Sequence, residues 1–137
     1  MMTMTTMTTT PLTTPGPSAL PLSRLRRVTD YIQEHLDQPL TLAHLGAVVF
    51  MSPYHFARLF QRSTGLPPHR FVVRARIDHA AALLAAPELS IAQISRLVGF
   101  RTPSHFATVF HRMMGVTPSE YRARHLRAGR GGHDGLQ

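Results

Sequence analysis

The chain contains nearly the same fourteen residues twice, fifty positions apart. Residues 52–65 read SPYHFARLFQRSTG, and residues 102–115 read TPSHFATVFHRMMG. When one is laid over the other, Pro, His, Phe, Ala, Phe, Arg and Gly recur at the same positions. Two segments this similar are expected to adopt the same local structure, so the repeat restricts the fold to one with two similar halves.

Both copies carry the signals that begin and end a helix. Ser52 and Thr102 are preferred N-cap residues, and each precedes a proline at the first helical position, where the missing N–H is harmless. Gly65 and Gly115 stand where a left-handed C-cap favours glycine. Each copy is therefore predicted to form one helix of about three turns.

The chain between its two ends has helical periodicity and no strand-like alternation. We predict an all-α fold of seven helices. Ser23 and Thr41 cap the first two, a long fourth helix follows Pro67-Pro68, and capping boxes at Ser90–Gln93 and Thr117–Glu120 open the fifth and seventh. A short helix, a tight turn and a three-turn helix in each half form the layout of a helix-turn-helix unit.

These helices predict the domain organisation. We expect two helix-turn-helix subdomains joined by a long linker helix, with a disordered tail at each end. The expected segments are a Met/Thr/Pro-rich tail at 1–22, the first subdomain at 23–66, the linker helix at 67–87, the second subdomain at 88–126 with its last helix ending near Leu126, and a Gly-rich tail at 127–137.

The two copies differ mainly on one face of the predicted helix. At about 3.6 residues per turn, the face assigned to the core is apolar in both copies and holds Phe56, Leu59 and Phe60. The opposite face holds Tyr54, Arg58 and Gln61, with Ala57 at its edge. Scaffold residues are thus kept while outward residues change among hydrogen-bonding types, which favours a working surface over an unconstrained one.

The charge of the chain indicates an anionic partner. The formal net charge is +8, and all fifteen basic residues are arginine. Such an excess fits nucleic acid or an acidic membrane surface, and arginine binds phosphates and guanine edges with paired hydrogen bonds. The two repeated helices carry His55, Arg62, His105 and Arg112 along one flank and contain no acidic residue.

Several classes of function find little support. The chain has no cysteine, and within the predicted helices no histidine pair at i, i+4 is joined by an acidic third ligand. We expect no metal, no cofactor and no enzymatic activity. No apolar run is as long as the roughly 20 residues that a helix needs to cross a bilayer. The apolar stripes match one another instead of facing lipid, which argues against membrane-surface binding.

Together these features predict binding to double-stranded DNA. A helix fits the major groove, where polar side chains can read base edges, and small residues such as Ala57 and Ala107 permit close approach. Two such helices would enter successive major grooves, about 34 Å apart. The remaining alternative is a protein-interaction module of the same fold that does not bind DNA.

The chain resembles the DNA-binding domain of the AraC/XylS family of bacterial transcription regulators, over about residues 24 to 126. The resemblance rests on PLTLAHLGAVVFMSPYHFARLFQRSTG, on RIDHAAALL in the linker helix, and on SIAQISRLVGFRTPSHFATVFHRMMGVTPSEYR. It implies seven helices, two helix-turn-helix subdomains and contact with promoter DNA and RNA polymerase in the cytoplasm, close to the nucleoid.

Positions that match the family motif supply the expected site residues. Carried over by position, the base-reading residues are Tyr54, Ala57, Arg58 and Gln61 in the first unit and Pro103, Ser104, His105 and Thr108 in the second. Residues near the helix starts and along the flank are expected to bind phosphates: Thr41, His55, Arg62, Ser90, Arg101, His111 and Arg112.

Two positions depart from the family pattern. Phe50 stands where the turn usually carries glycine, and a large residue would strain a left-handed conformation there by about 1 kcal/mol or more. We therefore expect the first turn to be shaped differently. Thr108 stands where a long polar or basic residue is common, so the second unit is expected to contact fewer bases.

Most members of the family carry an effector-binding or dimerisation domain on the N-terminal side. Here a Thr-rich stretch stands before the DNA-binding part. The chain is either a stand-alone regulator, expected to act as a monomer on DNA, or a piece of a larger sensor.

Overall fold

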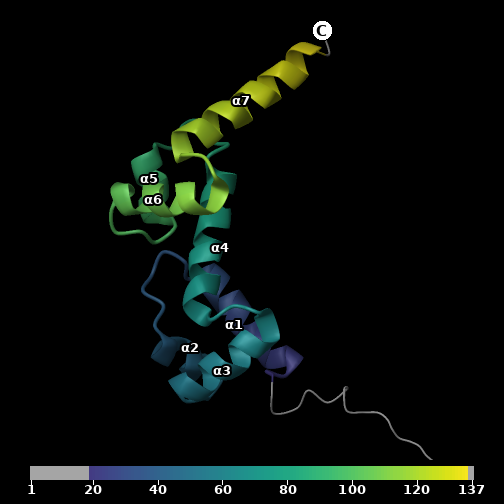
Figure 1. Cartoon of the computed structure of the whole chain (residues 1–137), viewed down its shortest axis with the longest axis vertical. Coiled ribbons are helices and arrows are strands. Elements are labelled where there is room, and N and C mark those ends of the chain that lie inside the picture. Colours follow the sequence, from purple (N-terminus) through teal and green to yellow (C-terminus); the bar gives the residue numbers. More distant parts are fainter. Residues whose placement is uncertain (1–18, 136–137) are drawn as a thin grey trace, which may run out of the picture. The chain divides into compact units, whose positions relative to one another are not determined.

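The computed structural model describes residues 19–135, and all regular structure in that range is helical (Figure 1). The helices are α1 (Leu22–Glu34), α2 (Leu42–Val48), α3 (Pro53–Thr64), α4 (Pro68–Leu83), α5 (Ile91–Leu97), α6 (Pro103–Met114) and α7 (Pro118–Gly135). The predicted all-α fold of seven helices is confirmed. The tail expected at residues 1–22 falls mainly on residues 1–18, outside the described residues.

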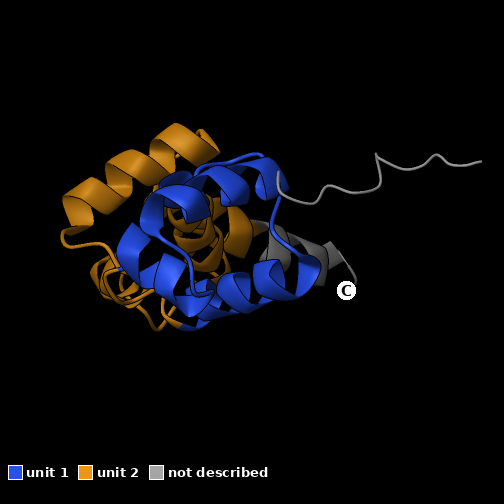
Figure 2. Cartoon of the chain, turned by 90° about the horizontal axis from the view of Figure 1, so that it is seen from below, with its two compact units in different colours: residues 1–34, 40–71 blue, residues 35–39, 72–137 orange. Residues whose placement is uncertain are grey.

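The chain divides into two compact units (Figure 2). Unit 1 comprises residues 1–34 and 40–71, and unit 2 comprises residues 35–39 and 72–137. Each unit holds one pair of a short helix and a three-turn helix, α2–α3 in unit 1 and α5–α6 in unit 2. The first turn of α4 belongs to unit 1 and the rest of that helix to unit 2, so the expected linker helix is shared between them.

The core of unit 1 is made by one stripe from each of its helices. The side chains at most 1% exposed are Val28 and Ile32 of α1, Leu45 and Val49 from α2 and its end, and Phe56 and Phe60 of α3. The Phe60 ring also meets the edge of Phe71 in α4, with centroids 5.1 Å apart and planes at 87°. Edge-to-face pairs of this kind are favourable beyond the area they bury.

Unit 2 repeats this packing fifty positions later. Its buried cluster comprises Ile77, Ala80, Leu84, Ile94, Val98, Phe100, Phe106, Val109 and Phe110. Phe110 meets the edge of Tyr121 in α7, with centroids 5.6 Å apart and planes at 80°. Phe60–Phe71 and Phe110–Tyr121 are equivalent pairs, so the duplication extends beyond the fourteen matching residues.

Most predicted caps are present in the structure. The hydroxyls of Thr41, Ser52, Ser90 and Thr102 each accept a hydrogen bond from a backbone N–H three residues on. Ser23 is the exception, because α1 already begins at Leu22 and the Leu25 N–H bonds to the Pro21 carbonyl. Pro21, one residue before Leu22, supplies the first carbonyl acceptor of the helix, and Ser23 therefore lies inside the first turn.

α4 ends at Leu83, four residues before the Pro87 at which the sequence predicted its end. The reason lies in α7. The Arg122 guanidinium donates to the carbonyl oxygens of Leu84 at 3.1 Å, Ala86 at 3.1 Å and Leu89 at 2.6 Å. These carbonyls lack helical partners, and the arginine satisfies them after the chain has left the helix.

α7 is longer than expected. The sequence predicted an end near Leu126 and a disordered Gly-rich tail at 127–137, whereas the helix continues to Gly135. No proline follows Pro118, so every later residue keeps its backbone donor. Glycine weakens a helix by about 1 kcal/mol relative to alanine but does not block its hydrogen bonds.

The turns inside the two units are alike in hydrogen bonding but differ in length. Phe50 N–H bonds to Ala47 O and Met51 N–H to Gly46 O, and Gly99 and Phe100 bond in the same way to Arg96 and Ser95. α2 and α5 are therefore related by forty-nine positions, while α3 and α6 are related by fifty. The first turn is one residue shorter.

Phe50 occupies the left-handed position of the first turn, with φ 59°, where Gly99 has φ 97° in the second turn. The expectation that a large residue would force another conformation there is wrong. The two matching hydrogen bonds of the turn hold the backbone in place, and the Phe50 side chain stays 81% exposed, where nothing crowds it.

Gly99 lies against a half-buried arginine, Arg76. A Cβ atom at Gly99 would overlap the Leu36 carbonyl oxygen and lie 2.8 Å from Arg76 Nε. Arg76 Nε donates to that same carbonyl at 3.0 Å, and its terminal nitrogen donates to Gln38 O at 2.8 Å. Burial lowers the pKa of Arg76, and the nearby Asp37 carboxylate opposes this shift. Only glycine fits between these groups.

We expect Gly99→Ala to destabilise unit 2 far more than Gly115→Ala. Both glycines have positive φ, but Gly115 has no atom within 4 Å of an added Cβ. Gly115→Ala should therefore show backbone strain alone, about 1–2 kcal/mol. Gly99→Ala adds the clash with Leu36 and Arg76. Chemical denaturation of both variants measures the difference, and equal losses would refute the steric role of Gly99.

At Phe50, glycine should give a more stable protein than alanine. Phe50→Ala removes the ring but keeps a Cβ atom in the left-handed region, whereas Phe50→Gly also relieves the strain, by about 1 kcal/mol. Glycine elsewhere is less favourable than alanine by about 0.5–1 kcal/mol. Thermal unfolding of the pair tests the sign, and a less stable glycine variant would contradict the strained conformation.

Candidate nucleic-acid interface

The start of α3 is fixed by its cap and by its buried face. Ser52 Oγ accepts from the His55 backbone N–H at 3.3 Å, and Pro53 stands at the first helical position. Phe56 and Phe60 are fully buried and Leu59 is 6% exposed. With these three side chains in the core, the rotation of α3 about its own axis is determined.

The outward face of α3 is the one that the repeat comparison predicted. Tyr54 is 74% exposed, Arg58 and Gln61 are exposed, and Ala57 is half-buried at the edge. These four expected base-reading residues therefore lie on one accessible face, as the helical wheel indicated. Their roles toward DNA stay predictions.

Tyr54 and Arg58 form a pair on that face. The guanidinium carbon of Arg58 lies 5.9 Å from the centroid of the Tyr54 ring. The two residues are one helical turn apart, and the attraction of a cation to an aromatic face favours this placement. The contact restricts the long arginine side chain before any partner binds. The spacing of the two residues in the sequence could have predicted it.

The outward side chains of α6 are shorter than those of α3, and two of them already have partners in unit 2. The residues Pro103, Ser104, His105 and Thr108 are all exposed. Thr108 Oγ1 donates to the Ser104 carbonyl at 3.1 Å, and the His105 ring meets the edge of Phe100 with centroids 5.5 Å apart. Two of the four side chains thus already have partners in their own unit. That the second helix makes fewer base contacts stays a prediction.

The candidate phosphate-binding residues are all exposed, but they are not equally free. Thr41 Oγ1 and Ser90 Oγ accept the His44 and Gln93 backbone N–H groups, at 3.1 Å and 3.0 Å. Arg62, Arg101 and Arg112 are exposed, as are the side chains of His55 and His111. His111 lies near Glu120, whose pKa is lowered by hydrogen bonds from Thr117 and further by His111 and Arg124.

The charge on the two helix-turn-helix pairs has one sign. No Asp or Glu occurs between Asp37 and Asp78, which includes α2 and α3, or between Glu88 and Glu120, which includes α5 and α6. An ordinary solvated surface carries both signs. The surfaces of these four helices can therefore attract a polyanion without repelling it at any point.

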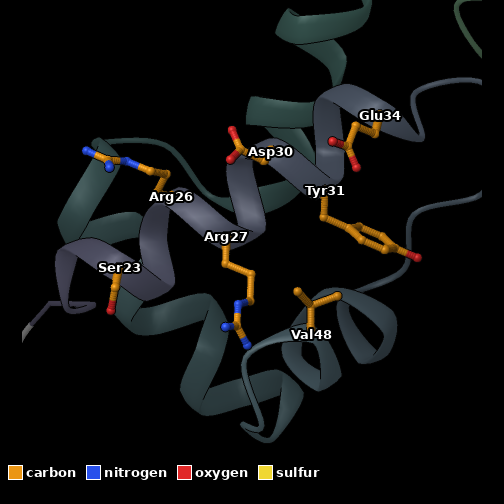
Figure 3. A pocket seen from close by; sticks show the side chains of 7 residues that line it. All are labelled: Ser23, Arg26, Arg27, Asp30, Tyr31, Glu34 and Val48. Carbon is orange, nitrogen blue, oxygen red and sulfur yellow. The ribbon is translucent and has the colours of Figure 1, made fainter.

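α1 differs in this respect. A groove beside it is lined by Ser23, Arg26, Arg27, Asp30, Tyr31, Glu34 and Val48 (Figure 3). Figure 3 shows Arg27 and Tyr31 extending from α1 towards Val48 of α2, with carboxylates on the same helix. The groove is open and mixes both charges. It lacks the enclosed apolar wall typical of a small-molecule site.

Neither a metal-ion cluster nor a membrane-spanning helix is found in the part of the chain that the structure describes. It contains no group of three or more His, Asp or Glu side chains placed to hold a metal ion. Within the same residues, no helix is both long and apolar enough to span a membrane.

Comparisons with known proteins agree with this geometry. Residues 45–124 match the family model described as a helix-turn-helix domain. The regulatory protein PocR of Salmonella typhimurium is 37% identical over 88 residues, which cover 64% of this chain and 29% of PocR. The chain spans about a third of the length of the curated relatives it matches first.

Two solved structures share the fold. One is the DNA-binding domain of AdpA, a global transcriptional factor, in complex with a target DNA. It has a TM-score of 0.73 and 31% identity, and the match covers 79% of this chain and 96% of that one. The other is an AraC-type transcriptional regulator from Chromobacterium violaceum, with a TM-score of 0.71 and 26% identity over 76% of this chain and 93% of that one.

Proposed function

The chain belongs to the AraC-type family of helix-turn-helix transcription regulators that bind DNA sequence-specifically, and from this premise we propose that α3 and α6 are its two reading helices. Each would enter a major groove, and the two grooves would be successive ones on one side of a promoter. The family is not enzymatic, and the chain acts by binding.

One observation carries this proposal. Two capped three-turn helices bury their phenylalanines and turn polar faces outward, and neither helix nor its short partner contains a carboxylate. A helix in the major groove meets base edges along its outward face and phosphates along both flanks. A surface that serves both tasks must be polar, cationic where it meets phosphates, and free of acidic side chains.

In the first unit, Arg58 is the proposed principal base reader. Its guanidinium can donate two parallel hydrogen bonds to O6 and N7 of guanine, and Tyr54 restricts the side chain at 5.9 Å. Gln61 can pair with an adenine edge or support the arginine, and half-buried Ala57 permits close approach. Arginine held over an aromatic ring loses less freedom on binding than a free one does.

In the second unit, Pro103, Ser104, His105 and Thr108 are the proposed contacts. All are short or already partnered within unit 2. Sequence preference should therefore depend more on α3 than on α6.

Seven residues are proposed to hold phosphates: Thr41, His55, Arg62, Ser90, Arg101, His111 and Arg112. Exposure of all seven side chains supports the assignment. The three arginines are its main members, because Thr41 and Ser90 also cap their helices and His111 faces Glu120. Phosphate contacts of this kind position a protein on the duplex without reading sequence.

RNA polymerase is the proposed protein partner, and the cytoplasm, at the nucleoid, the proposed location. Membership in a family of transcription regulators supports both. For a stand-alone regulator, a monomer on DNA is the proposed binding state, since two different reading helices in one chain suit an asymmetric site without a second copy.

The first test selects bound duplexes from random oligonucleotides. It then measures the affinity of the protein for the most enriched duplex at several salt concentrations. Each phosphate contact should lower the slope of log K against log salt by about 0.9, so the slope should be steeply negative. A slope near zero, or no enriched sequence, would show that the chain is instead an interaction module of the same fold.

Arg58→Ala should weaken binding to the selected site by about 1–3 kcal/mol and relax the preference at one base position. The matched control is Arg24→Ala, which removes the same charge from an exposed position on α1. Competition binding against duplexes substituted at each position measures both effects. An unchanged preference profile in Arg58→Ala would reject the assignment of Arg58.

Arg62→Gln and Arg112→Gln should weaken binding to all sequences alike and reduce the magnitude of the salt slope by about 1 each. Glutamine keeps part of the aliphatic stem, so packing along the helix edge is largely preserved. If these arginines only cover the apolar edge, unfolding stability will fall while the salt slope stays the same.

A further inference from the structure

Phe50 combines two features that a folded chain normally avoids. It is the only non-glycine residue with positive φ among the described residues, and its side chain is 81% exposed. A left-handed conformation is unfavourable for a residue with a Cβ atom, and an aromatic ring gains nothing by standing in water. The fold of unit 1 therefore offers no reason for phenylalanine here.

The second unit shows what the turn itself requires. Gly99 holds the same position with the same hydrogen bonds, and the aromatic residue that follows it, Phe100, is 7% exposed and packs on Phe106 with ring centroids 5.4 Å apart. In the first unit the residue after the left-handed position is the half-buried Met51. The aromatic residue has thus been placed one position earlier, outside the core.

Phe50 stands close to the proposed reading surface. It precedes the α3 cap, Ser52, by two residues, and Tyr54, 74% exposed, lies in the first turn of that helix. The N-terminal residues of a recognition helix are those that contact base edges in helix-turn-helix proteins. A strained backbone that is retained next to such a surface indicates a functional role for the residue.

We propose that Phe50 is a specificity-determining residue that packs its ring against the 5-methyl group of a thymine at the edge of the site read by α3. This rests on the proposed function of α3. Thymine is the only DNA base that presents a methyl group in the major groove, and phenylalanine is among the side chains that contact it.

Charge favours DNA over a protein as the partner of this ring. The forty residues from Gln38 to Ile77 contain no Asp or Glu, and Arg58 and Arg62 are exposed on the helix that follows the turn. A ring in a segment free of carboxylates is not repelled by DNA, and the same electrostatic attraction brings it and α3 towards the duplex. A contact with the transcription machinery is the competing outcome of the test below.

The test compares wild type, Phe50→Gly and Phe50→Leu on the selected duplex. Each thymine of the duplex is replaced in turn by deoxyuridine, which lacks only the methyl group. Wild type should lose about fourfold in affinity at one position, the value expected for burying a single methyl group. Phe50→Leu should keep part of that sensitivity. Phe50→Gly should bind the thymine duplex less tightly and should not distinguish the two duplexes.

Thermal unfolding of the same variants separates binding from folding. Because Phe50→Gly relieves the backbone and removes a ring that lies in solvent, it should be at least as stable as wild type, so weaker binding cannot be ascribed to unfolding. If no thymine position distinguishes wild type from Phe50→Gly, the proposal is overturned. It is also overturned if DNA binding is equal and only transcription in a reconstituted assay changes, since the ring would then contact a protein. Failure of wild type to select any duplex would instead reject the function proposed for α3.

Discussion

The packing of one phenylalanine of each three-turn helix against the first turn of the helix that follows in its unit supports the rest of the structure. Phe60 meets Phe71, and Phe110 meets Tyr121, both edge to face and fifty positions apart. Each pair ties the inner face of a three-turn helix to the element that follows it. With the inner face held in this way, the outward face cannot rotate into the core. A surface used for reading base edges has to be rigid in this sense, because its side chains must meet donors and acceptors at fixed positions.

Six arginines of the described residues fall into two groups with different surroundings. Arg76 and Arg122 donate to carbonyl oxygens that have no helical partner, at Leu36 and Gln38 and at Leu84, Ala86 and Leu89 respectively. Both belong to the structure of unit 2. Arg58, Arg62, Arg101 and Arg112 are exposed on or beside α3 and α6. Net charge alone does not separate these groups, since a guanidinium counts the same whether it meets a carbonyl or a phosphate.

Duplication with unequal turns explains much of the difference between the units. The first turn is one residue shorter, and an added Cβ at Gly46 would lie 2.7 Å from the Met51 carbonyl oxygen. The equivalent residue in the second unit is Ser95 of α5, which is fully buried and donates to Ala92 O at 2.8 Å. The shorter turn thus requires glycine inside α2 and accepts phenylalanine at its left-handed position. In the longer turn, Gly99 holds the left-handed position, and the aromatic residue that follows it, Phe100, is buried.

Most helix caps and the outward faces of α3 and α6 could be predicted from the sequence, because these depend on interactions within about four residues along the chain. Ser52, Pro53 and Gly65 marked the bounds of α3, and the fifty-residue repeat marked those of α6. The end of α4 depends on contacts between distant segments, because Arg122 donates to carbonyl oxygens that follow the helix, the first of them at Leu84, thirty-eight residues earlier in the chain. The tertiary structure also decided that Phe50 takes a left-handed backbone, that Gly99 must lie against Leu36 and Arg76, and that His105 packs on Phe100. These features depend on contacts between distant segments, or on the closure of a turn against its helix, which periodicity and propensity do not report.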